Sequence, residues 1–200
     1  GKRKGQVNPR FLDPELFLEA VFEPNFDAFA DHLGAFVFEF APMAPGNRPT
    51  PDAFAKAVDA FLEVLPDGPL YAFELRNKDL LTPAYLDVLR HHKAIHVFNL
   101  WSYMPSIGQQ MSLGDLFTGP AVVSRIMLTP GNRYADRVKA WSPFDRLQSV
   151  SPRYRDEALA LIREALDRQL NIYIIINNKL EGCSPLSLKA LAEALAEPQP

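Results

Sequence analysis

Short apolar segments alternate with amphipathic stretches along most of this chain, and this alternation limits the possible folds more than any other feature. Each segment is five to eight residues long and rich in Val, Ile, Phe or Tyr, which is typical of buried parallel strands. The segments are Phe36–Phe40, Leu70–Arg76, Ile95–Leu100, Ala121–Leu128 and Ile172–Asn177. The alternation predicts an α/β protein with a parallel sheet covered by helices.

The helices between these segments have explicit start signals. A hydroxyl residue precedes a proline at Thr50-Pro51, Thr82-Pro83, Ser151-Pro152 and Ser184-Pro185. The hydroxyl can accept a hydrogen bond from the first helical turn, and proline lacks an N–H that would be unpaired there. Each pair therefore predicts a helix start with the hydroxyl residue at the N-cap. We also expect helices over Phe26–Leu33 and Tyr134–Trp141.

Composition narrows the class of protein further. The 200 residues are 48% hydrophobic and 22% charged with a net charge of −3, which excludes a disordered chain and does not favour a nucleic-acid partner. The longest apolar runs are far below the ~18 residues that span a bilayer, and the basic opening GKRKGQ lacks a signal peptide's apolar segment. The single cysteine, Cys183, fits a reducing compartment. We expect a single α/β domain over residues 1–200, cytoplasmic and without a membrane partner.

Side chains that can form hydrogen bonds stand near the carboxyl ends of the strand segments, where a buried parallel strand should be apolar. They are Glu39, Glu74, Arg76, Asn99, Trp101, Arg125, Asn177 and Asn178. Parallel α/β folds bind ligands at this edge of the sheet. Strand side chains alternate between faces, so Glu74 and Arg76 should point to the interior while Tyr71 and Phe73 face the helices.

In one interpretation these residues form a pocket that binds or converts a small polar or anionic metabolite. Glu74 and Glu39 are the candidate catalytic residues, with Glu74 as general acid or base. Arg76 and Arg125 would hold an anion. The remaining residues would bind and orient the substrate; they are Asn99, Trp101, Asn177 and Asn178.

In the other interpretation the same residues are structural. Glu74 and Arg76 would form a buried ion pair, Asn99 would cap a loop, and Asn177-Asn178 would satisfy the turn into the segment EGCSP. The first interpretation leads to an enzyme and the second to a non-catalytic ligand- or partner-binding protein. Fold alone does not choose between them.

Other catalytic motifs do not occur in the sequence. GxGxxG, GxxxxGK[ST], HExxH and GxSxG are all absent, so no cofactor can be named from the residues. The four histidines, His32, His91, His92 and His96, lack metal-ligand spacing. His91 and His92 end a helix, and adjacent helical residues point about 100° apart. We therefore predict a solvated helix end there and no metal site.

Several segments resemble the YecE-like family, domain of unknown function 72. YAFELRNKDLLTPAYLDVLRHH resembles its strand, loop and helix in which an acidic residue and an arginine end the strand. IYIIINNKLEGCSPLSLKALAEAL is similar to the family's ending, where a strand closes in N-N. HLGAFVFEFAPM and WSPFDRLQ are similar to two further segments, so the resemblance extends from about residue 8 to 196.

The resemblance implies a TIM-like β/α barrel whose activity is not established. It matches Glu74, Arg76, Arg125 and Asn177-Asn178 to the family's polar strand ends. Glu39 stands where the family often has Gln, and the family's H-G is absent after Arg125. These departures bear on whether the catalytic use of those strands is shared.

The strand number differs from that of a complete barrel, since an eight-stranded barrel needs about 250 residues. We expect the last five β/α units of a TIM-type barrel, N-terminally incomplete, with an open sheet edge near Phe36–Phe40 and irregular structure at Gly1–Asn8. An open, doubly wound sheet is the alternative. Exposed edges of this kind would favour association between molecules.

Overall fold

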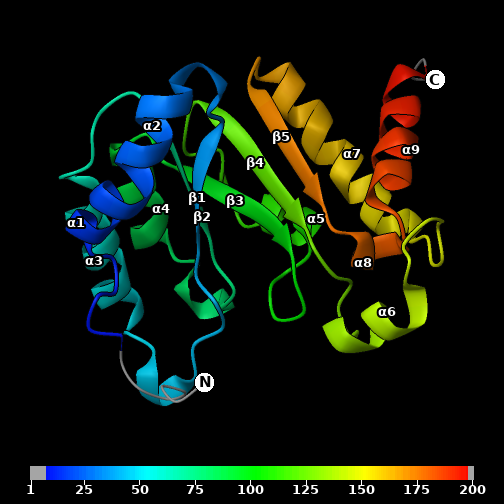
Figure 1. Ribbon diagram of the computed structural model, residues 1–200, viewed down its shortest axis with the longest axis horizontal. Coiled ribbons are helices and arrows are strands. Elements are labelled where there is room, and N and C mark those ends of the chain that lie inside the picture. The colour runs from blue at the N-terminus through cyan, green and yellow to red at the C-terminus, as the bar shows by residue number, and fades with distance from the viewer. Residues whose placement is uncertain (1–7, 198–200) are drawn as a thin grey trace.

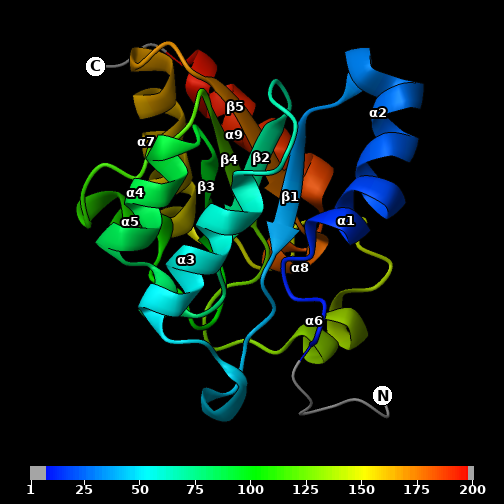
Figure 2. The ribbon, with the colours of Figure 1, turned by 90° about the vertical axis from the view of Figure 1, so that its left-hand side faces the viewer.

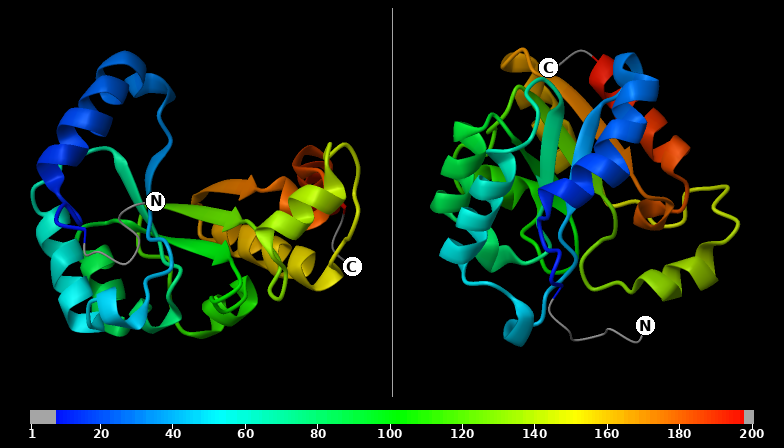
Figure 3. Two further views of the ribbon diagram at one scale, coloured as in Figure 1. Left: turned by 60° about the horizontal axis from the view of Figure 1, so that its bottom comes forward. Right: turned by 60° about the vertical axis from the view of Figure 1, so that its left-hand side comes forward.

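A computed structural model describes residues 8–197 of the protein. Its core is a parallel five-stranded sheet with the order β1-β2-β3-β4-β5, curled into a half-barrel (Figure 3). The strands are β1 (Ala35–Glu39), β2 (Leu70–Glu74), β3 (Ile95–Leu100), β4 (Ala121–Ile126) and β5 (Asn171–Ile176). All five predicted strands are present, and four of them differ from the predicted bounds by one or two residues.

Helices connect the strands and precede the first one. They are α1 (Pro14–Phe17), α2 (Glu23–Phe29), α3 (Pro51–Leu62), α4 (Pro83–His91), α5 (Ile107–Ser112), α6 (Tyr134–Trp141), α7 (Pro152–Asp167), α8 (Asn178–Glu181) and α9 (Ser184–Ala196). Helical turns of other types are the π-helical η1 (Leu18–Phe22) and the 3-10 turns η2 (Ala30–His32), η3 (Pro45–Asn47) and η4 (Lys78–Leu80). The predicted helix over Tyr134–Trp141 is α6, with the predicted bounds.

The helices cover the convex face of the sheet, with α3, α4 and α5 over its middle strands and α7 beside β5 (Figures 1 and 2). Helix α1 covers β1, where the Phe17 ring lies 5.5 Å from that of Phe36 and 4.9 Å from that of Phe38. The carboxyl ends of the strands point toward α6 and α8 in Figure 1. None of the helices within residues 8–197 is long and apolar enough to cross a bilayer.

The two faces of the sheet carry different side chains, as the alternation predicts. Tyr71 and Phe73 belong to the large core between sheet and helices. A smaller apolar cluster lies on the concave face, and it contains Ala72, Ile95, Val97, Ala121 and Val123. The prediction that Tyr71 and Phe73 face the helices is therefore confirmed. Glu74, the next residue along β2, is directed to the concave side.

The hydroxyl–proline signals predict four helix starts but not every cap. Thr50 and Thr82 accept hydrogen bonds from the backbone N–H groups of Ala53 and Tyr85, as expected. Ser151 is an N-cap without a side-chain capping bond. The prediction of Ser184 as an N-cap is wrong, because α9 begins one residue earlier, with Cys183 at the cap. The Asn178 side chain accepts from the Ser184 N–H at 2.7 Å and replaces the hydroxyl.

The helix predicted over Phe26–Leu33 begins earlier and ends earlier than expected. Helical residues extend from α1 through a π-helical turn, η1, into α2, which ends at Phe29. Proline inside a helix normally clashes with the carbonyl one turn before it. At Pro24 the wider π turn precedes the proline and makes room for it. The sequence pattern misses the helical residues before Phe26, because a proline is not expected within a continuous helix.

The prediction that His91 and His92 point apart is wrong. Their ring centroids lie 4.7 Å apart. His92 is the C-cap of α4, and its backbone, with φ −90° and ψ 5°, is no longer α-helical. The open sheet edge predicted near Phe36–Phe40 is present in the described part of the chain, since β1 pairs there with β2 alone. No strand precedes β1 within residues 8–197. The prediction for Gly1–Asn8 falls, except for Asn8, outside the described residues.

Candidate functional site

Two carboxylates and two guanidiniums form a closed ring of ion pairs at the carboxyl ends of β1, β2 and β4. Arg76 Nη2 lies 2.7 Å from Glu39 Oε2, and Arg76 Nε lies 3.0 Å from Glu74 Oε1. Arg125 Nη1 lies 2.9 Å from Glu39 Oε2 and also donates to Glu74 Oε2. We call these four residues the Glu–Arg ring.

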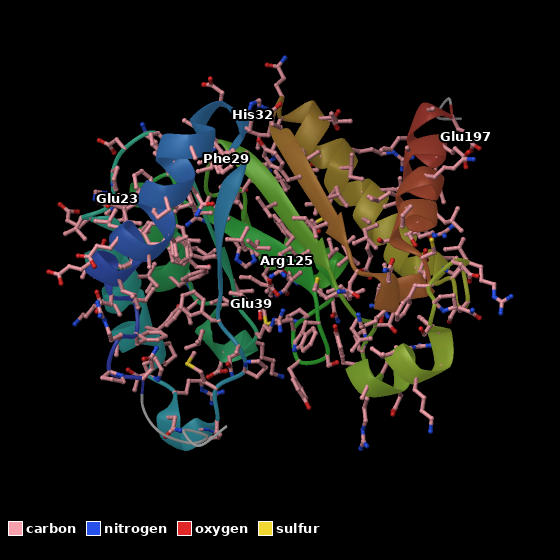
Figure 4. The ribbon with its side chains drawn as sticks, in the orientation of Figure 1. Glu23, Phe29, His32, Glu39, Arg125 and Glu197 are labelled. Atoms are coloured by element: carbon pink, nitrogen blue, oxygen red, sulfur yellow. The ribbon has the colours of Figure 1, made fainter. Side chains whose placement is uncertain are left out.

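Strand register and sheet curl bring the ring together. Glu39 and Glu74 are direct neighbours in the parallel pairing of β1 and β2, on the same face. Two carboxylates so placed would repel each other without cations between them. Arg125 lies on β4, next to Asn99 of β3, and only a curled sheet lets its side chain reach β1. Figure 4 shows Arg125 and Glu39 directed toward one another across the concave face.

The ring is neutral overall but not saturated. The Glu74 side chain is fully buried, whereas that of Glu39 is 37% exposed. Both Glu74 oxygens hold guanidinium partners. Within residues 8–197, Glu39 Oε1, Arg76 Nη1 and Arg125 Nη2 have no hydrogen-bond partner. The ring can therefore still accept one bond and donate several.

Asn99 and Trp101 complete the cluster and leave two polar atoms unpaired. Asn99 Nδ2 donates to the Leu75 carbonyl at 2.6 Å and lies 3.4 Å from Glu74 Oε1. Asn99 Oδ1 and Trp101 Nε1 are buried without a partner, and the Arg76 guanidinium stacks over the Trp101 ring at 4.1 Å. Buried polar atoms are nearly always paired, so unpaired ones call for an explanation such as a ligand.

A cavity of about 840 Å³ adjoins the ring through Arg76. Loops after β1, β2 and β3 line it, which is the expected edge of a parallel sheet. Its polar lining includes Arg48, Arg76, Lys78, Asp79 and Gln109. Arg48 pairs with Asp79 at 3.1 Å and Arg76 with Glu39 and Glu74, so Lys78 is the cation of this wall that has no ion pair among the described residues. Sequence reasoning missed Arg48 and Lys78 because loop residues carry no periodicity.

Asn177 and Asn178 do not join the Glu–Arg ring through any hydrogen bond of the described residues. Asn177 Oδ1 accepts from the Lys179 N–H at 3.0 Å and caps α8. Asn178 Oδ1 accepts from the Ser184 N–H, as described above. These bonds match the structural interpretation of the pair, in which the two amides satisfy the turn into EGCSP.

A second buried carboxylate, Glu181, lies in that turn and is missed by the sequence analysis. Arg155 binds it with two nitrogens at 2.9 and 2.7 Å. The Ser187 hydroxyl donates to it at 2.7 Å and the Ser151 N–H at 3.4 Å. Its own carbonyl accepts from Gln148 and Ser149. Glu181 therefore fastens the loop before α7 to α8 and α9.

His96 lies on the convex side of β3, behind the ring. Desolvation by burial lowers the pKa of His96 to about 4, and a bond to Gln110 Oε1 at 3.3 Å opposes this only in part. Gln110 in turn donates to the Asn99 carbonyl at 2.7 Å. His96 is consequently a neutral core residue at pH 7 rather than a proton donor to the site.

Comparison with known families and structures gives one family. The model for the family described as Protein of unknown function DUF72 matches residues 8–200. No curated protein matches the chain.

Solved structures agree in fold. A DUF72 family protein from Thermotoga maritima is similar with a TM-score of 0.59 at 16% identity, over 88% of this chain and 64% of that one. A DUF72 family protein from Enterococcus faecalis V583 gives 0.57 at 15% identity, over 88% and 67%. The chain thus spans about two thirds of the length of these relatives.

Proposed function

Because this chain belongs to the DUF72 family, for which no function is established, we propose its function from the site: it binds, and as an enzyme converts, a small anionic metabolite at the carboxyl ends of β1 to β4. Arg76 and Arg125 hold the anion through their spare guanidinium N–H groups. Asn99 Oδ1 and Trp101 Nε1 orient it, and Glu39 Oε1 is the carboxylate oxygen within its reach.

One observation carries the proposal: Arg76 of the Glu–Arg ring lines a cavity that also holds the unpaired cation Lys78, and the polar atoms of Asn99 and Trp101 beside the ring are buried without partners. Guanidinium groups recognise carboxylates and phosphates through two parallel N–H bonds. Here Glu74 accepts hydrogen bonds from both guanidiniums and fixes their positions, so they are preorganised for a ligand. In a catalytic role, an arginine first exchanges its glutamate partner for the bound anion. The released Glu74 or Glu39 carboxylate then exchanges protons with the ligand.

A non-catalytic role is the second candidate, and the closure of the ring favours it. Both Glu74 oxygens already have partners, and Glu74 is not among the residues that line the cavity. In that case the cluster is a scaffold or a recognition surface, and Asn177 and Asn178 serve α8 and α9 only. The two candidates differ in whether a bound anion is changed chemically.

The same proposal includes the setting of the site. We propose that the half-barrel represents the last five β/α units of a TIM-type barrel in a single domain, and that the protein works in the cytoplasm on a small molecule rather than on nucleic acid. The open β1 and β5 edges favour association with further strands. The activity of the complete protein is part of this proposal, since the chain spans 64% of its Thermotoga relative.

The test is a thermal-shift screen with small anions at constant ionic strength, using phosphate, citrate, malonate and glycerol phosphate against sodium chloride. We expect at least one anion to raise the melting temperature. Lys78→Met removes a cavity cation that has no ion pair in the described residues, and we expect it to weaken binding several-fold. Each anion that raises the melting temperature is then incubated with the protein and examined for chemical conversion by NMR.

The matched control is Lys189→Met, which removes an exposed lysine on α9. It should leave the anion response unchanged, because Lys189 is no part of the cavity lining. A protein that no anion stabilises beyond sodium chloride contradicts the binding proposal. Stabilisation that Lys78→Met and Lys189→Met reduce equally would show a general charge effect and would contradict it as well.

A further inference from the structure

Two helices end side by side at the edge of the sheet opposite the Glu–Arg ring, and their ends bring three metal-binding side chains together. Glu63 is the C-cap of α3, His91 is the last residue of α4, and His92 is its C-cap. Ligand atoms of these three residues all lie within 4.8 Å of one another. The elements are close because α3 and α4 pack against each other beneath the same strands.

The surroundings favour a cation. The unpaired carbonyls at a helix C-terminus carry partial negative charge, and here two such ends converge. Asp59, one turn before Glu63, lies 2.7 Å from His92 Nε2. A carboxylate that holds one imidazole nitrogen fixes the ring and raises the basicity of the other, an arrangement typical of metal-ligating histidines. Nδ1 is then the nitrogen of His92 that is available to a metal.

We propose that Glu63, His91 and His92 bind a zinc ion, with Asp59 positioning His92. Two imidazoles and one carboxylate are a ligand set that zinc adopts when a fourth, water-filled position stays open, whereas calcium and magnesium take oxygen ligands. His91 and His92 also line a cavity of about 540 Å³ together with Asp67 and Tyr71, which gives space for a water ligand at the fourth position. Lys93 lines the same cavity, so its ammonium group competes with the ion for this space.

The test is zinc titration of the chain, freed of any affinity tag, by isothermal calorimetry. The unmodified chain should bind one zinc ion per molecule. His91→Ala should weaken binding by more than about tenfold, and Asp59→Asn by about 10- to 100-fold, the range for losing a carboxylate behind a histidine ligand. His32→Ala is the matched control, because His32 is an exposed histidine outside the cluster, and it should bind like the unmodified chain.

Cobalt provides a second readout, which tests Glu63 as a ligand without substituting either histidine. Glu63 is exposed, so Glu63→Gln should fold normally and should change the visible spectrum of bound cobalt by removing one ligand. Equal zinc affinity in His91→Ala and the unmodified chain would overturn the proposal. So would an unchanged cobalt spectrum in Glu63→Gln. Both outcomes are independent of anion binding at the Glu–Arg ring.

Discussion

Glu74 and Glu181 are both fully buried carboxylates bound by arginine, yet their surroundings differ. Glu181 has a single cationic partner, Arg155, and its remaining acceptor positions are filled by a hydroxyl and a backbone N–H. The space beside it is about 10 Å³, too small for anything but a water molecule. Its environment is complete without a ligand.

Glu74 shares two arginines with a second carboxylate, Glu39, and its neighbourhood is not complete. Unpaired atoms of Asn99 and Trp101 remain, and the cavity of about 840 Å³ begins at Arg76. A buried Glu–Arg pair therefore does not identify a binding site by itself. What separates the two regions is the presence of spare hydrogen-bonding groups next to open space.

We expect the largest change in stability from the removal of the Glu181 carboxylate. Glu181→Gln leaves the half-buried Arg155 without a counter-charge, and no second carboxylate among its hydrogen-bond partners within the described residues replaces the one removed. We expect a loss of about 3–5 kcal/mol in the free energy of unfolding, measured by urea denaturation. Glu197→Gln, at an exposed glutamate, should change it by less than about 0.5 kcal/mol. A loss below about 1 kcal/mol for Glu181→Gln would contradict the structural role.

A pH titration distinguishes the contribution of His96 to stability from that of the buried carboxylates. The pKa of His96 is lowered to about 4 by burial, and a histidine in the unfolded chain titrates near 6.5. Between these pH values the unfolded state binds more protons, so the contribution to stability is full above about pH 6.5 and is lost as the pH falls toward 4. The difference corresponds to about 3 kcal/mol.

His96→Phe should remove this part of the acid destabilisation while keeping the aromatic packing against Tyr85 and Phe98. The measurement is the urea midpoint at several pH values between 7 and 4.5. If the variant and the unmodified chain lose stability in parallel, His96 is not the group that titrates. Any acid destabilisation that remains in the variant belongs to the buried carboxylates.

The sequence predicts the fold better than the details of the site. Strand alternation places Glu74 on the concave face correctly, because a period of two leaves only one alternative. It does not predict that Arg125 reaches Glu39, since that contact depends on the curl of the sheet between β4 and β1. Family resemblance groups Asn177 and Asn178 with the strand-end residues, but the short helix α8 draws their side chains into capping.

The most direct test of the central claim is the urea denaturation of Glu74→Gln beside that of Glu181→Gln. If the Glu–Arg ring is a site, Glu39 keeps both arginines paired after the substitution, and Glu74→Gln lowers the free energy of unfolding by less than about 1.5 kcal/mol, roughly one tenfold step in the folding constant. The two curves must have matched slopes. A loss of about 3 kcal/mol or more, equal to that of Glu181→Gln, would contradict the claim and make Glu74 a structural ion-pair residue.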